Sequence, residues 1–146
     1  MPQPRPVIDV CAAVIVNGGR MLLAQRERGS HLAGKWEFPG GKIDGGETPG
    51  ECIIREIDEE LGLIVRNPVP LTTVEHAYDE KIVRLHFLAC DLTGPADHEA
   101  RVHEEVRWVE YDDLEQLDLA PADRRFVHWL GRNWQEAARV LPDASA

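Results

Sequence analysis

The chain has 146 residues, 43% of them hydrophobic and 29% charged, which suits a single globular domain with one core. With 26 acidic residues against 16 basic ones, its net charge of −10 excludes long nucleic acid as a favourable electrostatic partner. No apolar run approaches the roughly 20 residues that a transmembrane helix needs, and the proline-rich start lacks the apolar stretch of a signal peptide. We therefore expect a cytoplasmic protein with no membrane partner.

The predicted elements alternate between strands and a few helices. Apolar patterning and turn residues predict strands at 7–16, 21–24, 71–75, 82–90 and 106–109, a loop at 27–35, and helices at 48–61, 111–117 and 121–134. This order favours an α/β or α+β fold in which helices cover a mixed β-sheet. We expect one domain over residues 7–140, with flexible ends at 1–6 and 141–146.

The helix at 48–61 has the clearest boundaries. Thr48 suits the N-cap, Pro49 the first helical position, and Glu51 completes a capping box. Gly62 is then expected as the C-cap glycine.

Three cysteines, Cys11, Cys52 and Cys90, are widely spaced among apolar neighbours. They form no CxxC pair, and their odd number argues against a disulfide framework. We expect buried structural thiols.

Three glutamates of this helix are candidates for metal ligands. Glu56, Glu59 and Glu60 have i, i+3, i+4 spacing, so they project from one side of the helix, and Glu47 precedes it. Such a cluster is either a solvated acidic face or a site for a hard cation such as Mg²⁺. We expect Glu59 and Glu60 to face solvent before a metal binds.

Two further features surround the cluster. Arg55 is placed to pair with a neighbouring carboxylate and hold it in one orientation, although a surface ion pair is the alternative. Gly40 and Gly41 allow the backbone to approach a ligand and can present a bare carbonyl, although a tight turn would also explain them. The helix N-terminus favours an anion near this loop.

The stretch from Gly41 to Leu63, GKIDGGETPGECIIREIDEELGL, resembles the Nudix box at every position of that motif. The matching residues are Gly41, Glu47, Arg55, Glu56, Ile57, Glu59, Glu60, Gly62 and Leu63. Trp36-Glu-Phe-Pro-Gly-Gly-Lys42, the Trp108 strand and Ala120-Pro-Ala-Asp123 are similar to MutT-type enzymes, so the resemblance covers most of residues 8 to 130. It implies the Nudix α/β/α sandwich with a mixed β-sheet.

The resemblance also implies a chemistry. MutT-like Nudix enzymes hydrolyse a nucleoside triphosphate to the monophosphate and pyrophosphate with Mg²⁺, for which Mn²⁺ can substitute. Glu59 and Glu60 are then metal ligands, the Gly40 carbonyl is a third, and Glu56 is either the general base or a ligand. Arg55 orients the glutamates, and Glu47 bonds Arg55.

One position departs from the family pattern. The family often adds a distant glutamate as a metal ligand before the strand tryptophan, and counting back from Trp108 places Val102 there. Glu104 or Glu105 would replace it after a small shift of the loop. We interpret His103 as a surface histidine.

By the same resemblance, Arg26, Phe38, Tyr78 and Asp123 line a nucleoside site. Phe38 and Tyr78 offer ring faces for base stacking, with core packing as the alternative. An ionised Asp123 only accepts hydrogen bonds, which favours an exocyclic amine such as that of cytosine or guanine, with a helix-terminal charge as the alternative. Candidate substrates are 8-oxo-dGTP, dCTP and a 5-modified CTP.

Two other functions stay open at this point. Hydrolases of ADP-ribose or sugar nucleotides often carry a proline in the segment after the box, and residues 76–81 contain none, so this function is disfavoured. A non-catalytic nucleotide-binding module usually lacks box glutamates, and here every one is present. The sequence leaves the choice between monomer and homodimer open.

Overall fold

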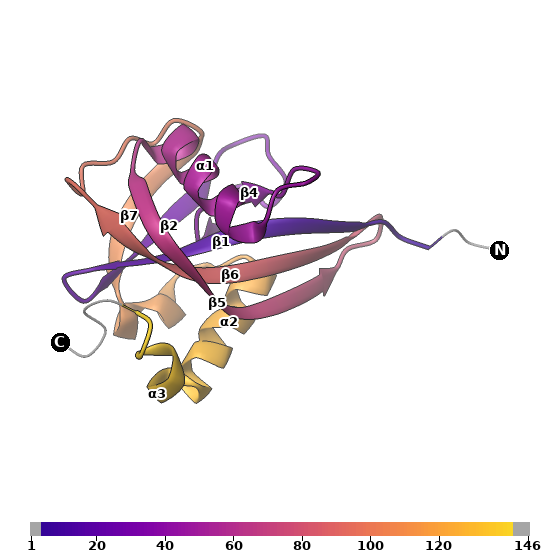
Figure 1. Ribbon diagram of the computed structural model, residues 1–146. Helices are drawn as coiled ribbons and strands as arrows, with labels where there is room; N and C mark the ends of the chain where they lie inside the picture. Colours follow the sequence, from indigo (N-terminus) through magenta and orange to yellow (C-terminus); the bar gives the residue numbers. More distant parts are fainter. Residues whose placement is uncertain (1–3, 142–146) are drawn as a thin grey trace.

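The computed structural model describes residues 4–141 and forms one domain built on a sheet (Figure 1). Of the ends expected to be flexible, residues 1–3 and 142–146 lie outside the described part. Arg5 donates to the Tyr78 carbonyl at 2.9 Å and the Pro6 carbonyl accepts from Ile82 N–H at 2.9 Å, while Leu141 is buried. The ordered contacts therefore reach slightly beyond 7–140 at both ends.

The elements follow in the order strands, helix, strands, helices. They are β1 (Val7–Asn17), β2 (Arg20–Arg26), β3 (Trp36–Glu37), β4 (Gly40–Lys42), α1 (Pro49–Leu61), β5 (Ile64–Ala77), β6 (Ile82–Thr93), β7 (His103–Glu110), the 3₁₀ helix η1 (Tyr111–Gln116), α2 (Pro121–Arg132) and α3 (Trp134–Ala137). Among residues 4–141, no helix is both long enough and apolar enough to cross a membrane.

The sheet has seven strands and is mixed. Its main order is β3-β2-β1-β6-β5, with β4 also paired to β1 and β7 also paired to β2. β1 and β6 run parallel, whereas the other pairs are antiparallel. This is the mixed sheet that the sequence predicted.

Strand β1 divides the core into two layers. Cys11, Ala13 and Ile15 face the cluster that contains Ile53 and Ile57 of α1, whereas alternate residues such as Val14 face the cluster that contains Phe126 of α2. Helix α1 therefore covers one face and α2 with α3 cover the other (Figure 1). A strand covered on both faces must be almost wholly apolar, as β1 is.

Helix α1 has the caps that the sequence predicted. The Thr48 side chain accepts from Glu51 N–H at 3.1 Å, and the Glu51 carboxylate accepts from Thr48 N–H at 2.9 Å. Gly62 ends the helix in the left-handed conformation, with φ of 68°. These caps fix where the helix begins and ends, and thus where Glu56, Glu59 and Glu60 stand.

Some boundaries differ from the prediction. β5 begins at Ile64, not at 71, because it accommodates Pro68 and Pro70 where its pairing with β6 shifts register. The predicted helix at 111–117 is a 3₁₀ helix, and the one at 121–134 ends at Arg132 before a short α3. The two short strands β3 and β4 were not predicted.

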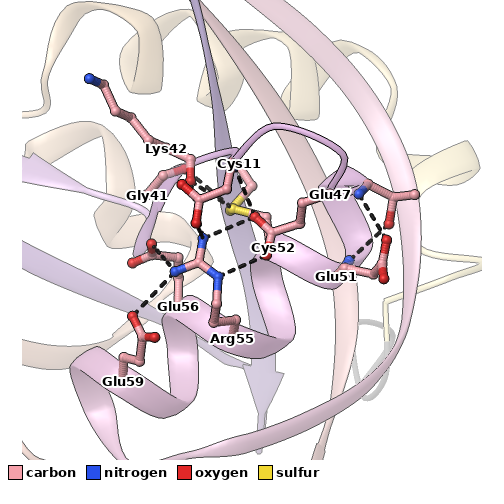
Figure 2. Close-up of a disulfide and its surroundings, with 11 residues drawn as sticks. Cys11, Gly41, Lys42, Glu47, Glu51, Cys52, Arg55, Glu56 and Glu59 are labelled. Atoms are coloured by element: carbon pink, nitrogen blue, oxygen red, sulfur yellow. Dashed lines mark hydrogen bonds and ion pairs between the residues drawn. A yellow bond between two sulfur atoms is a disulfide. The ribbon is translucent and has the colours of Figure 1, made fainter.

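The cysteines correct the interpretation that all three are thiols. Cys11 of β1 and Cys52 of α1 form a disulfide, and Cys90 is free and buried (Figure 2). The pairing was not visible in the sequence because 41 positions separate the two residues, and only the docking of α1 on β1 brings them together. The bridge ties the central helix to the central strand.

We predict that the unfolded chain has one reactive thiol before reduction and three after it. Closing a loop of 41 residues restricts the unfolded chain and contributes about 4 kcal/mol to stability by a chain-entropy argument. Thiol titration in guanidinium with and without reductant measures the count, and denaturant unfolding of the Cys11→Ala/Cys52→Ala double variant measures the stability. Three reactive thiols before reduction would contradict the pairing.

Candidate active site

The site is organised around the Arg55 side chain of α1. Its guanidinium makes five hydrogen bonds, which uses every donor that the group has (Figure 2). Two go to Glu47 at 2.8 and 2.9 Å, and the others go to Glu56 at 2.8 Å, Glu59 at 3.3 Å and the Lys42 carbonyl at 3.3 Å. Arg55 therefore connects the helix to the loop before it and orients the glutamates, as predicted.

The carboxylate of Glu47 is held by this guanidinium. The hydrogen bonds from Arg55 are the main cause that lowers the pKa of Glu47 to about 2, and Asp44 N–H adds a further bond at 3.1 Å. Glu47 thus stays ionised at any pH at which the protein would be assayed. Its contact with Arg55 is the one expected from the sequence.

Glycine is required at position 41 because of Glu56. A Cβ atom on Gly41 would lie 2.5 Å from the Glu56 carboxylate, and one on Gly40 would collide with the backbone of Cys11. Strand β4 can lie this close to β1 because Gly40 has no side chain, and the absence of one at Gly41 leaves room for the Glu56 carboxylate where Arg55 holds it. The paired glycines are therefore a close backbone approach and not merely a turn.

Glu59 and Glu60 lie in different environments although they are neighbours. The Glu59 side chain is 60% exposed, as expected, whereas Glu60 Oε2 is buried and has no hydrogen-bond partner. Burial and, after it, the nearby Glu56 carboxylate raise the pKa of Glu60 to about 9. The expectation that Glu60 faces solvent was wrong: the helix turns it inward, toward the sheet.

Glu60 opens onto a hollow of about 220 Å³, which we call the Glu60 hollow. Its lining combines acidic, glycine and imidazole groups: Arg26, Glu27, Ser30, Glu37, Gly40, Gly41, Glu60, Val102 and His103. Within it, Glu37 accepts from Arg26 at 2.9 Å and lies 3.3 Å from the His103 ring. The hollow therefore joins the box to β2, β3 and β7.

A second hollow, of about 250 Å³, adjoins the first, and we call it the Tyr78 hollow. It is lined by Ile8, Val10, Arg26, His31, Leu32, Glu37, Gly41, Lys42, Tyr78, Lys81, Val83, Leu85, Ala120, Ala122 and Asp123. Arg26, Glu37 and Gly41 line both hollows. The structure thus brings three of the four residues predicted for a nucleoside site, Arg26, Tyr78 and Asp123, next to the box.

Phe38 is the fourth, and it does not line this hollow. Its side chain is only 3% exposed and packs edge-on against Phe126 and Phe87, at 5.1 and 5.9 Å between ring centroids. The Phe38 ring therefore packs in the core, which was the alternative to base stacking. The backbone of Phe38 still matters, because its N–H donates to Asp123 Oδ1 at 2.9 Å.

Asp123 is buried at the start of α2. Burial raises its pKa well above the usual range, and the charge of Glu37 acts in the same direction. The hydrogen bond from Phe38 N–H opposes this shift but does not reverse it. Burial and Glu37 therefore both disfavour the ionised Asp123 that the sequence led us to expect.

The first residues of β7 point in different directions. Glu104 lies 3.7 Å from Arg28 and Glu105 lies 2.8 Å from Arg107, and neither lines the Glu60 hollow. His103 does line it, and its side chain is only 5% exposed. The interpretation of His103 as a surface histidine was therefore wrong.

Sequence reasoning missed several lining residues. Lys42, Lys81 and the imidazole of His31 line the Tyr78 hollow, and Glu37 lines both hollows. Lys42 directly follows the paired glycines. A lysine at that place in so acidic a chain was a signal from which it could have been named as a site residue. His31 and Lys81 come from a loop and a turn whose positions no spacing rule gives.

The residues present can provide hard ligands for a divalent cation, although they are not yet gathered around one point. Among residues 4–141, no group of three or more acidic, cysteine or histidine side chains converges closely enough to hold a metal ion. Arg55 holds Glu56 and Glu59, so these carboxylates would have to turn toward the ion. The buried Glu60 Oε2 without a partner is the observation that fits a cation, because its burial calls for a compensating charge.

A larger open hollow lies elsewhere on the molecule. It is lined by residues such as Gly18, Tyr111 and Trp134 and contains none of the predicted site residues. Another hollow, of about 670 Å³, contains no residue of the box and is lined by Gln25, Arg26, Arg28, Gly34, Glu104 and Glu105. The two smaller hollows are the ones lined by box residues, so they form the candidate site.

The chain is similar to known proteins over most of its length. The NUDIX domain family profile matches residues 5–130. The chain is 34% identical to 8-oxo-dGTP diphosphatase of Haemophilus influenzae, over 86% of this chain and 93% of that protein, and 35% identical to CTP pyrophosphohydrolase of Escherichia coli, over 80% and 86%. The solution structure of the E. coli ORF135 protein superimposes with a TM-score of 0.78 and 32% identity, and covers 92% of this chain and 94% of that one.

We predict that Glu60→Gln stabilises the metal-free protein at alkaline pH. Between the ordinary carboxyl pKa of 4.5 and about 9, the folded chain holds a proton at Glu60 that the unfolded chain releases. Stability therefore falls as pH rises through this window, and the neutral amide of glutamine removes that loss. In EDTA at pH 9, we expect Tm to rise by about 2 °C or more, with a smaller difference at pH 5.

Thermal unfolding at pH 5, 7 and 9 measures this effect. Glu59→Gln is the matched control, because Glu59 is exposed and its substitution should show no comparable pH dependence. An equal change of Tm at all three pH values for Glu60→Gln would argue against the buried, protonated carboxyl.

Proposed function

This chain belongs to the Nudix hydrolase family, whose domain profile covers residues 5–130, and from that membership we propose that it is an Mg²⁺-dependent nucleoside triphosphate pyrophosphohydrolase. The match confirms the resemblance of the stretch Gly41 to Leu63. The products are the nucleoside monophosphate and pyrophosphate. The observation that carries the proposal is the continuity of the Tyr78 hollow with the Glu60 hollow through Arg26, Glu37 and Gly41.

The Tyr78 hollow suits the nucleoside. Tyr78 has aromatic neighbours on two sides, with His31 at 4.8 Å and His76 at 4.6 Å between ring centroids. Such a cluster offers a face on which a base can stack. Asp123 supplies a hydrogen-bonding group at the far end, so the hollow can both hold a base and distinguish its edge.

The part of the Tyr78 hollow beside the box suits the phosphates of the substrate. Arg26 and Lys42 line the hollow beside the box and bring positive charge to an otherwise acidic surface. Mg²⁺ would be held by Glu59, Glu60, the Gly40 carbonyl and, in one of its two roles, Glu56, and would neutralise phosphate oxygens and activate water. In its other role, Glu56 accepts the proton of the attacking water, and Arg55 fixes that carboxylate in place.

The relatives narrow the substrate class. One is named for 8-oxo-dGTP and the other for CTP, and both names describe nucleoside triphosphate substrates. We therefore propose 8-oxo-dGTP, dCTP and 5-modified CTP as the first substrates to compare. Either base presents a hydrogen-bond donor beside an acceptor at its edge, which is what a protonated Asp123 can recognise.

We predict that Glu59→Gln retains less than a tenth of the wild-type kcat/KM, a loss of at least about 1.4 kcal/mol in transition-state stabilisation. The substitution removes one negative charge from the proposed metal site and leaves an exposed position of α1 otherwise unchanged. The assay separates pyrophosphate from orthophosphate release over a panel of triphosphates, ADP-ribose and UDP-sugars, with Mg²⁺ and with EDTA. Asp58→Asn, which changes an exposed neighbour on the same helix, is the control and should keep full activity.

Three outcomes would count against the proposal. Orthophosphate as the first product would exclude a pyrophosphohydrolase, and turnover in EDTA would exclude the metal. Faster cleavage of ADP-ribose than of any triphosphate would assign the chain to another branch of the family.

We predict that Asp123→Asn keeps the ranking of nucleotides at neutral pH within about threefold, because a protonated carboxyl and an amide both donate and accept. As pH rises through the raised pKa of Asp123, the wild type becomes an acceptor only and its kcat/KM falls, whereas the variant keeps its activity. Asp123→Ala should lose about tenfold or more, because it leaves polar groups unpaired.

The measurement is kcat/KM for CTP, dCTP, dGTP, 8-oxo-dGTP, UTP and dTTP at several pH values. A reversed ranking in Asp123→Asn at neutral pH would show instead an ionised Asp123 that only accepts, as the sequence alone suggested. An unchanged ranking in Asp123→Ala would mean that the base is recognised elsewhere.

A further inference from the structure

His103 is brought into the Glu60 hollow by an irregularity in the sheet. Gln25 of β2 pairs with Glu105, but the next residue, Arg26, pairs with His103, so Glu104 is the extra residue of a β-bulge. The bulge breaks the alternation of β7 at its first residues. Glu104 and Glu105 therefore pair with surface arginines, whereas His103 lines the hollow together with Glu60.

The two ring nitrogens of His103 have different surroundings. Nε2 lies 3.3 Å from Glu37 Oε2, and the other oxygen of Glu37 accepts from Arg26 at 2.9 Å. Nδ1 is buried and has no partner among the polar groups of residues 4–141. Because a carboxylate can only accept, Nε2 carries the ring proton, which leaves the lone pair of Nδ1 available.

The Glu60 hollow contains a second buried polar atom. Glu60 Oε2 also lacks a hydrogen-bond partner among residues 4–141, and a carboxylate oxygen is a ligand that divalent cations accept. Both atoms belong to residues that line one hollow together with Gly40 and Gly41, and a divalent cation there would satisfy the two of them. A carboxylate that receives the other N–H of a histidine is the arrangement that commonly orients metal-binding imidazoles.

We propose that His103 Nδ1 is a direct ligand of the divalent metal at this site, beside Glu60, and that Glu37 is the positioning residue that fixes its tautomer. The inference rests on the proposed function in that it concerns the same metal site. An imidazole nitrogen suits Mn²⁺ or Co²⁺ better than Mg²⁺, which prefers oxygen ligands. The site would therefore bind Mn²⁺ more tightly, relative to Mg²⁺, than a site with oxygen ligands alone.

The test uses the full chain loaded with Mn²⁺ and does not require turnover. Electron spin echo envelope modulation detects ¹⁴N nuclei bound to Mn²⁺, and titration calorimetry gives Kd for Mn²⁺ and for Mg²⁺. We expect ¹⁴N modulation in the wild type and its loss in His103→Asn, which keeps a polar atom near the position of Nδ1. The variant should bind Mn²⁺ about tenfold more weakly, with less than about a threefold change for Mg²⁺.

His128→Asn is the matched control, because His128 is exposed on α2 and its substitution should leave the ¹⁴N signal intact. Mn²⁺ binding without ¹⁴N modulation in the wild type, or modulation that persists in His103→Asn, would overturn this inference and leave the proposed function standing. Failure of the wild type to bind Mn²⁺ or Mg²⁺ at millimolar concentration would overturn both. Because the wild-type spectrum is decisive by itself, the test holds even if His103→Asn does not fold.

Discussion

The guanidinium of Arg55 is the interaction on which the geometry of the site depends. It donates hydrogen bonds to both carboxylate oxygens of Glu47, to one oxygen each of Glu56 and Glu59, and to the Lys42 carbonyl of β4. Without it, three carboxylates would face one another across a few ångströms and repel. A lysine would have three donors from a single point and could not reproduce this planar fork. The box therefore needs an arginine here for geometry as well as for charge.

The carboxylates around Arg55 share its positive charge, whereas the carboxyl of Glu60 on α1 does not. Arg55 keeps Glu47 ionised, with a pKa of about 2, whereas Glu60 forms no ion pair with a cationic side chain of residues 4–141 and has a pKa of about 9. A buried acceptor without a partner destabilises the fold, so its presence indicates a site shaped for a ligand that supplies the missing charge. The buried Glu60 carboxyl makes the metal-free fold less stable. A bound cation would release the proton of Glu60 and pair with its buried oxygen, so the same burial would favour metal binding.

What the sequence could predict was local, and what it could not was set by the packing of distant segments. Thr48, Pro49, Glu51 and Gly62 act within one helix, so its limits followed from spacing alone, whereas the burial of Glu60 Oε2 depends on how the helix packs. The Cys11–Cys52 bridge, by contrast, depends on how α1 lies on β1. Likewise, the inward turn of His103 depends on one bulged residue, and the alternation of a regular strand would not predict it.

Glu37 explains why the two hollows act as one site. Its carboxylate bonds Arg26, which lines both hollows, and faces the ring of His103 on the metal side. Its negative charge also contributes to the raised pKa values of both Asp123 and Glu60. One side chain thus acts electrostatically both on the group proposed to meet the base and on the group proposed to hold the metal. On that proposal, a cation bound beside Glu60 would offset the charge of Glu37 and so lower the pKa of Asp123 as well.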